Sequence, residues 1–147
     1  MRIADILKDK GAEVTTVSPD SPVSEAISVL ASRRIGAIPV SEDGRTLLGI
    51  VSERDVVRAL AQQGADGFGS MQVSELMTTN VYTCSPDSTL SGAMTLMDVR
   101  RIRHVPVVEN DVLVGILSIR DLVNARLKEA EIERQQMADY IANRTFN

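Results

Sequence analysis

The chain has 147 residues, of which 44% are hydrophobic, so it can bury one sizeable core but is short for two independent ones. Its 16 Lys and Arg and 20 Asp and Glu are spread evenly and give a net charge of −4, and only 3% of residues are aromatic; this argues against a nucleic-acid partner, because such proteins use basic patches and stacking rings. The charged amino-terminal segment leaves no apolar stretch long enough for a signal peptide or a membrane span, so we expect a cytoplasmic protein that does not enter a membrane.

An internal repeat organises the chain. Residues 14–40 align with residues 81–107 at an offset of 67, and thirteen of the 27 aligned positions are identical. After a one-residue gap the similarity resumes, with GIVSERDVVR from Gly49 aligned to GILSIRDLVN from Gly115. The chain therefore contains two copies of one supersecondary unit.

Each copy is predicted to open with a short helix and a short strand. The apolar positions of residues 3–7 indicate a helix, and residues 73–77 match it in the second copy. A strand is expected near Thr16 and, at the equivalent place, near Thr83.

The main helix of each copy has a marked start and an apolar stripe. Ser21 and Ser88 can cap this helix, and Pro22 suits its first position in copy one. The stripe comprises Val23, Ala26, Ile27 and Leu30 in copy one, and Leu90, Ala93, Met94 and Met97 in copy two. Its helical spacing predicts that the stripe faces the core.

Two strands and a last helix complete each copy. AIPV and HVPV are predicted strands, turns follow at residues 43–44 and 110–111, and LLGIV and VLVGIL form the returning strands. Ser52 and Ser118 mark the start of the last helix. About 60 residues in this order bury too little surface to be stable alone, so we expect an α/β (α+β) fold in which the copies pack about a pseudo-two-fold axis.

The two copies are predicted to span residues 1–63 and 73–127. Between them, residues 64–72 carry three glycines and little apolar periodicity, which is typical of a flexible linker. Residues 128–147 are rich in helix formers and are expected to form a projecting helix. From Asn124 on, the apolar positions at roughly helical spacing are Leu127, Ala130, Met137 and Ile141. Charged residues interrupt this apolar stripe. The incomplete stripe would be explained either by a partner helix from a second chain or by a solvated tail.

Both copies end with Gly-Ile-x-Ser-x-Arg-Asp, which places Ser52 with Asp55, and Ser118 with Asp121, at a strand-to-helix junction. One interpretation is structural, because in a capping box the serine caps the helix and the carboxylate returns a hydrogen bond. The other is functional, because a helix amino terminus beside a glycine attracts phosphate and a carboxylate can hold both hydroxyls of a ribose. The motif alone leaves both interpretations open.

The strand prolines add to the functional interpretation. Pro39 and Pro106 lack an N–H, so they interrupt sheet pairing and leave backbone groups that a base could meet. Repetition of the prolines together with the Ser-x-x-Asp motifs favours a nucleotide site.

The remaining reactive side chains do not indicate catalysis. Cys84 aligns with Val17, so we expect a small buried residue rather than a reactive thiol. One cysteine and one histidine, His104, are too few for a four-ligand zinc site, and the histidine has no evident triad partner. Neither a catalytic site nor a metal site is predicted.

Taken together, these elements resemble the CBS domain pair, or Bateman module, over nearly the whole chain. The resemblance rests on the duplicated V-x-T-x-S-P-D-S segments, the apolar-Pro-Val strands and the Gly-Ile-x-Ser-x-Arg-Asp ends. In that family the clefts between repeats can hold an adenosine derivative such as AMP, ADP, ATP, S-adenosylmethionine or NAD. The layout is also similar to stand-alone CBS-pair proteins of bacteria and plant organelles, which carry no enzyme domain.

The resemblance implies a set of nucleotide-binding residues. They are Thr16, Ala37, Ile38, Pro39, Ser52, Arg54, Asp55, Thr83, Arg103, His104, Val105, Pro106, Ser118, Arg120 and Asp121. By this resemblance the two aspartates would hold ribose, the two serines would lie beside it, the two threonines would line the base end, and the strand residues would flank the adenine.

The two clefts are expected to be unequal. Arg103 and His104 have no basic counterpart in copy one, so the phosphates of a nucleotide held by Asp55 are expected to meet them. The cleft at Asp121 would face Gly36 and Ala37 instead, and would suit a bulkier, less charged group.

The resemblance therefore implies a regulatory module that senses AMP, ADP, ATP or NAD(H) between its repeats and signals to another protein, without a catalytic cofactor. A homodimer is expected, because two-repeat modules of this family usually pair. An unliganded interaction scaffold, in which the Ser-x-x-Asp motifs only cap helices, is the alternative. An enzyme is disfavoured, because the sequence offers no nucleophile with an adjacent base.

Overall fold

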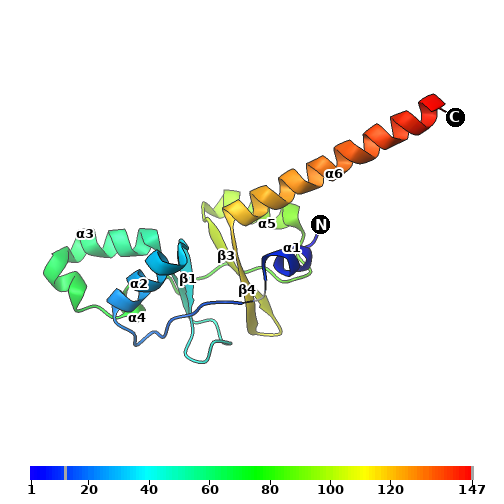
Figure 1. Ribbon diagram of the computed structural model, residues 1–147. Coiled ribbons are helices and arrows are strands. Elements are labelled where there is room, and N and C mark those ends of the chain that lie inside the picture. Colours follow the sequence, from blue (N-terminus) through cyan, green and yellow to red (C-terminus); the bar gives the residue numbers. More distant parts are fainter. Residues whose placement is uncertain (12, 147) are drawn as a thin grey trace.

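The computed structural model describes residues 1–11 and 13–146, so Asn147 of the predicted tail lies outside it. The elements in chain order are α1 (Ile3–Lys10), α2 (Val23–Arg33), β1 (Ala37–Val40), β2 (Gly49–Ser52), α3 (Glu53–Gly69), α4 (Val73–Leu76), α5 (Leu90–Arg100), β3 (His104–Glu109), β4 (Val112–Ser118) and α6 (Ile119–Phe146) (Figure 1). This order confirms the mixed α+β class, the tandem repeats and the C-terminal helix.

Each repeat contains one two-stranded antiparallel sheet. β1 pairs with β2, and β3 pairs with β4. The predicted turns connect them: Gly44 has a φ of 77°, and Asn110 and Asp111 have φ values of 51° and 63°. Positive φ at two consecutive turn residues matches the twist of the flanking strands, which explains the tight β3–β4 hairpin.

The strand expected at the start of each repeat is reduced to a single bridge. Val17 pairs in parallel with Val40, and Cys84 pairs in parallel with Val107. A proline follows two residues after each bridge and cannot donate to the ladder, so the pairing stops there.

The predicted caps of the main helices are wrong. Pro22 is the N-cap of α2 and makes no side-chain cap bond, while Thr89 caps α5 by accepting the Gly92 N–H at 3.0 Å. Ser21 and Ser88 are instead held by their backbone, because their carbonyls accept hydrogen bonds from the first helix of the other repeat.

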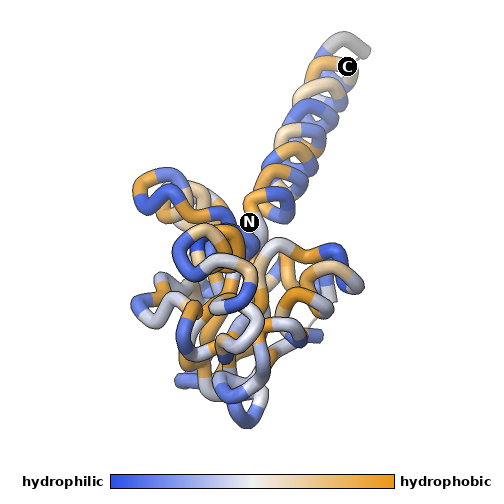
Figure 2. The backbone as a smooth tube through the Cα atoms, turned by 90° about the vertical axis from the view of Figure 1, so that its left-hand side faces the viewer, coloured by the Kyte–Doolittle hydropathy of each residue, from blue (hydrophilic) through white to orange (hydrophobic). Residues whose placement is uncertain are grey.

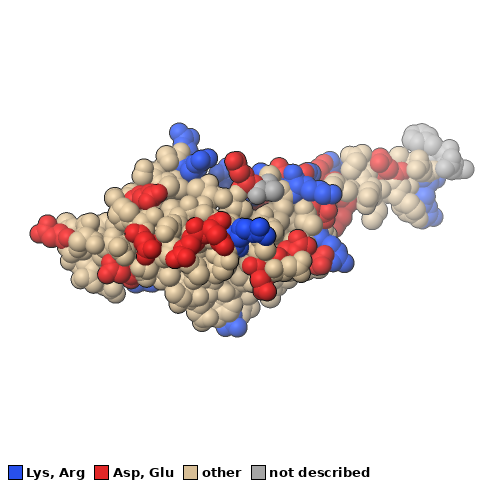
Figure 3. Space-filling view, turned by 90° about the horizontal axis from the view of Figure 1, so that it is seen from below, with Lys and Arg blue, Asp and Glu red and all other residues tan. Residues whose placement is uncertain are grey.

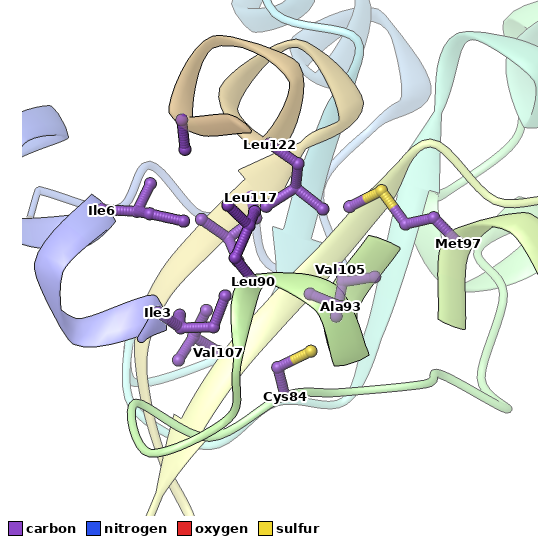
Figure 4. Packing of buried hydrophobic residues seen from close by; sticks show 11 residues of the cluster. Ile3, Ile6, Cys84, Leu90, Ala93, Met97, Val105, Val107, Leu117 and Leu122 are labelled. Carbon is purple, nitrogen blue, oxygen red and sulfur yellow. The ribbon is translucent and has the colours of Figure 1, made fainter. Parts of the chain in front are cut away.

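The first helices of the two repeats are exchanged. Ile3 and Ile6 of α1 lie in a core with Leu90, Leu117 and other residues of the second repeat (Figure 4). Conversely, Val73 of α4 lies in the core of the first repeat. The sequence repeats and the packing units are therefore not the same.

Reciprocal backbone bonds fasten the exchanged helices. Ile3 N–H donates to the Ser88 carbonyl, and Val73 N–H donates to the Ser21 carbonyl, each at 2.9 Å. Isolated β-bridges between Arg2 and Thr89, and between Gln72 and Pro22, likewise join the start of each first helix to the other repeat. Because each contact has a counterpart with the repeats interchanged, the packing follows the expected pseudo-two-fold axis.

The predicted flexible linker is largely helical. α3 continues to Gly69, although Gly64 interrupts it with a φ of 72° and a ψ of 170°. Ala61, Gln62, Gln63 and Ala65 flank Gly64 and are good helix formers, which accounts for the continuation, and glycine accepts the positive φ of the kink.

α6 leaves the body of the molecule and projects from it (Figure 1). Its first turns are anchored by the buried Leu122 and Ala125, whereas residues 130–144 are all exposed. Hydrophobic and hydrophilic residues alternate along the projecting part (Figure 2). Within the described residues, no helix is both long and apolar enough to cross a membrane.

Candidate functional site

The first strand-to-helix junction places Asp55 at the start of α3. Its carboxylate Oδ2 accepts hydrogen bonds from the Ser52 N–H at 2.9 Å and the Ser52 hydroxyl at 3.0 Å. Ser52 Oγ accepts the Asp55 N–H at 3.3 Å. Oδ1 accepts from the Thr78 hydroxyl at 3.3 Å, and the Arg58 guanidinium lies 3.7 Å from it. The capping interpretation is correct, and Oδ1 retains capacity for a further donor.

The second junction places Asp121 at the start of α6. Its Oδ2 accepts from the Ser118 N–H at 2.8 Å and from the Lys10 ammonium, also at 2.8 Å. Burial alone would raise the pKa of Asp121, but the bonds from Lys10 and Ser118 outweigh burial and hold this pKa below its usual range. The second carboxylate is therefore ionised and paired with a cation.

Two hollows between the repeats each contain one of these aspartates. We call them the Asp55 cleft, with a volume of about 320 Å³, and the Asp121 cleft, with about 470 Å³. The sequence-predicted residues that line the Asp55 cleft are Ala37, Ser52, Arg54, Asp55, Arg103 and His104. Those that line the Asp121 cleft are Ala37, Pro39, Arg103, His104, Ser118, Arg120 and Asp121. Each cleft is thus built from both repeats.

A larger hollow of about 790 Å³ adjoins the Asp55 cleft between α5 and α6. It shares Arg54, Arg101 and Arg103 with the cleft, but its walls are mostly apolar, with Met94 and Val123 among them. Because neither junction aspartate lines this hollow, the two clefts are the better candidate sites.

Arg103 and His104 lie between the clefts and line both. A Cβ added at Gly36 would lie only 2.8 Å from His104 Cε1, so glycine allows the histidine ring to approach the other repeat. Burial lowers the pKa of His104, and the charge of Lys10 lowers it further. Gly36 and Ala37 line the Asp121 cleft as expected, but Arg103 and His104 line it as well, so the expectation that these two residues meet only the Asp55 cleft is wrong.

The structure also adds basic residues that the sequence analysis did not assign. Arg34 lines the Asp121 cleft and Arg101 lines the Asp55 cleft, at equivalent places. Both end a helix with left-handed backbone, with φ values of 53° and 54°. Left-handed backbone is unfavourable for a residue other than glycine. The presence of arginine at this position in both repeats was therefore the sequence signal that could have indicated a role in the clefts. Among the described residues, four Lys or Arg side chains line each cleft.

Other predicted residues lie outside both linings. Thr16 and Thr83 do not line either cleft, whereas Thr15 and Thr78 do. The side chains of Ile38, Val105 and Pro106 are fully buried in the core, which limits any ligand contact to their backbone.

The idea that the strand prolines free backbone groups is wrong. Pro39 and Pro106 remain paired with the returning strands, opposite Ile50 and Ile116. Their carbonyls accept hydrogen bonds from the Val17 N–H at 3.2 Å and the Cys84 N–H at 3.0 Å. The single-residue bridges therefore use the carbonyls that were expected to be open.

The chemistry of the clefts is that of binding. Each offers a carboxylate that can accept hydroxyl donors and several cations that can meet negative charge. Cys84 is buried as predicted, and burial raises the pKa of its thiol. In the part of the chain that the structure describes, no cluster of three or more His, Cys, Asp or Glu residues is placed to hold a metal ion.

Family comparison agrees with this architecture. A model of the CBS domain matches residues 3–62 and 73–128, so the chain belongs to the CBS domain family, in which such pairs are regulatory modules. It is 39% identical to the CBS domain-containing protein YhcV of Bacillus subtilis over 75% of this chain and 76% of that protein.

Solved structures of stand-alone CBS-domain proteins share the fold. The CBS-domain containing protein ATU1752 of Agrobacterium tumefaciens is 46% identical, with a TM-score of 0.81, covering 86% of this chain and 99% of that one. The CBS domain pair of protein MJ0100, solved in complex with 5-methylthioadenosine and S-adenosyl-L-methionine, is 27% identical with a TM-score of 0.75, covering 85% of this chain and 98% of that one.

Proposed function

We propose that this protein is a regulatory module that binds an adenosine-containing nucleotide, AMP, ADP, ATP or NAD(H), in the clefts between its repeats and signals to another protein in the cytoplasm. The observation that carries the proposal is the duplicated carboxylate at a strand-to-helix junction, placed in a cleft with several arginines. The adenosine ligands of the related MJ0100 pair support the ligand class.

The geometry suits a ribose followed by phosphate. A carboxylate oxygen with spare acceptor capacity can take a sugar hydroxyl, and the arginines provide charge-assisted hydrogen bonds for phosphate. On the face shown in Figure 3, acidic and basic side chains are interspersed, and the basic ones form no continuous patch of the kind that nucleic-acid binding uses.

We also propose that two copies pair as a homodimer. Exposed apolar side chains on α3 and α6, including Val57, Ile119 and Val123, give the body an apolar surface beside the projecting helix. Pairing would remove this surface from water. The regulated partner would then meet a module with two copies of each cleft.

Ligand-dependent thermal stability tests the nucleotide proposal. AMP, ATP or NAD(H) should raise the melting midpoint, since a ligand at 100 times its dissociation constant adds about 2.7 kcal/mol to the free energy of unfolding. Guanosine nucleotides should raise it less. The double substitution Asp55→Ala with Asp121→Ala should abolish the shift while the protein remains folded.

A matched variant, Asp66→Ala, removes an exposed carboxylate of α3 outside both clefts and should keep the full shift. If no adenosine compound changes the midpoint or gives heat in calorimetry, the nucleotide proposal fails. The alternative scaffold function would then be favoured, with the capping boxes serving only the helices.

A further inference from the structure

Lys10, the last residue of α1, reaches into the Asp121 cleft. Its ammonium donates to Asp121 Oδ2 at 2.8 Å and to the Ile116 carbonyl at 2.6 Å. The exchange of the first helices brings it there, because Ile3 and Ile6 dock α1 on the core of the second repeat. The helix thus holds a cation against the carboxylate.

The Asp55 cleft has a neutral residue, Thr78, at the corresponding edge. Thr78 and Ile50 exchange two backbone hydrogen bonds of 2.9 Å each, and the Thr78 hydroxyl contacts Asp55 Oδ1 at 3.3 Å. The difference arises because α4 ends at Leu76 and the chain then runs beside β2, whereas α1 continues to Lys10. Two equivalent carboxylates therefore have different neighbours.

This difference decides which carboxylate a ribose can use. Ribose hydroxyls are neutral donors, and hydrogen bonds between an ammonium and a carboxylate are about twice as strong as neutral ones. A ribose that places its two hydroxyls on both oxygens of Asp121 would have to displace Lys10 from Oδ2. At Asp55 it would compete with the Thr78 hydroxyl at 3.3 Å and with the longer Arg58 contact at 3.7 Å, both on Oδ1.

Building on the proposed nucleotide binding, we propose that Lys10 is a tethered cation that keeps ribose out of the Asp121 cleft. Each chain then binds one adenosine ligand, at Asp55. A second ligand enters the Asp121 cleft only when Lys10 leaves the carboxylate.

The lysine also connects the Asp121 cleft to α6. Asp9, its neighbour in α1, forms an ion pair of 3.0 Å with Lys128, and the amino terminus lies 3.4 Å from Glu129. Displacement of Lys10 therefore acts on the same short helix that contacts the base of the projecting helix.

Calorimetric titration with AMP measures the number of sites. The wild-type chain should bind one AMP, and Lys10→Met should bind two, with affinity at the Asp121 cleft raised about tenfold or more, as expected for loss of a charge-assisted competitor. Lys8→Met removes an exposed charge from the same helix away from the cleft and should still bind one. Lys10→Gln provides a second neutral variant should Lys10→Met fail to fold.

Further substitutions assign the sites. Asp55→Ala should remove the wild-type site, and Asp121→Ala should leave it. Lys10→Met with Asp55→Ala should bind one AMP at the Asp121 cleft, a site absent from Asp55→Ala alone.

The outcomes separate this inference from the function on which it rests. Two AMP sites in the wild type, loss of wild-type binding through Asp121→Ala, or an unchanged site number in both Lys10 variants would overturn the role of Lys10 and leave nucleotide binding intact. If neither the wild type nor the Lys10 variants take AMP, ATP or NAD(H), both proposals are wrong.

Discussion

His104 lies between the two clefts, and its ionisation depends on both repeats. Burial lowers its pKa most, and the nearby charges of Lys10 and Arg103 lower it further, while Glu53 and Asp121 act in the opposite direction. The net effect is a pKa below the ordinary value, so the folded protein holds a neutral imidazole at neutral pH.

We predict that the free energy of unfolding falls as the pH drops below about 6.5. The unfolded state takes up a proton on His104 near its ordinary pKa of 6.5, whereas the folded state does so only at lower pH. Between these values the unfolded state binds more protons, so stability present above 6.5 is lost as the pH falls toward the folded pKa.

Urea unfolding at about pH 7.5 and pH 5.5 measures this loss. His104→Gln keeps a polar side chain but does not titrate, so its stability should change less over the interval. If wild type and His104→Gln lose the same free energy of unfolding, titratable groups other than His104 cause the loss. A wild-type free energy of unfolding that rises at the lower pH would contradict the prediction.

At the residue scale, the sequence predicted the candidate site residues that belong to a short repeated motif, but not those that tertiary packing brings to the site. The motif brings Ser, Arg and Asp within one helical turn of a strand end, and the structure places Asp55 and Asp121 in the two clefts; their binding of a nucleotide remains a prediction. Lys10 and Thr78 were missed because the exchanged helices bring them in from far along the chain. No spacing rule links Lys10 to a carboxylate 111 residues away.

At the scale of elements, the glycine of the Gly-Ile-x-Ser-x-Arg-Asp motif serves the exchange of helices. A Cβ on Gly49 would lie 2.8 Å from the Thr78 carbonyl, where α4 leads into the strand-like segment. A Cβ on Gly115 would lie 2.6 Å from Leu7 Cδ2 of α1. Both glycines let an incoming segment approach a strand closely, a role separate from phosphate binding.

We predict that Gly49→Ala is more destabilising than Gly115→Ala. The obstacle at Gly49 is backbone, which cannot rotate away, so a loss of about 1–3 kcal/mol is expected, as for other overpacked sites. At Gly115 the obstacle is the end of a flexible leucine, which can move. The midpoints of urea unfolding compare the two.

Gly69, at the end of α3, provides the control because an added Cβ would meet nothing within 4 Å. Gly69→Ala should therefore be neutral or stabilise by up to about 1 kcal/mol. Equal losses at Gly49 and Gly115 would show that backbone contact is not the deciding factor.

The helices were predicted well because their apolar stripes have a helical period and need no tertiary information. The exchange of α1 and α4 was not predicted, since both helices have similar apolar faces and either core could accept either helix. The folded arrangement depends on how far the connecting segments reach, which the apolar pattern does not encode. The same limit applies to the segment of residues 64–69, whose glycines suggested a flexible chain but which is held as a kinked helix.

At the scale of the whole molecule, α6 presents apolar side chains far from the body. Leu127 is 63% exposed and Met137 is 60% exposed, and they lie on one side of the helix by spacing. Arg134 lies between them and is paired with Glu131 at 2.7 Å. A second copy of the helix would cover this side.

We predict a homodimer that is weakened by truncation after Lys128. Light scattering at micromolar concentration should give twice the chain mass of 16.0 kDa for the full chain and a smaller average for the truncated chain. Far-ultraviolet circular dichroism should show that the repeats stay folded, since their cores end at Ala125.

Substitutions separate the apolar side of α6 from its length. Leu127→Glu should weaken the dimer, whereas Gln136→Glu, on the opposite side of the helix, should not. A monomeric full chain would refute the dimer, and a truncated chain that dimerises as strongly as the full one would limit the contact to the body.

The exchange of first helices also sets an order of events during synthesis. The core that receives α4 uses residues between Val17 and Met77, whereas the core that receives α1 extends to Ala125. At a translation rate of about 5–20 residues per second, α1 emerges roughly 6–25 s before its binding surface is complete. An eight-residue helix has little stability alone, so this segment stays unfolded beside the ribosome while the rest of the chain is made. The nascent protein thus completes its first core before its first helix has anywhere to dock.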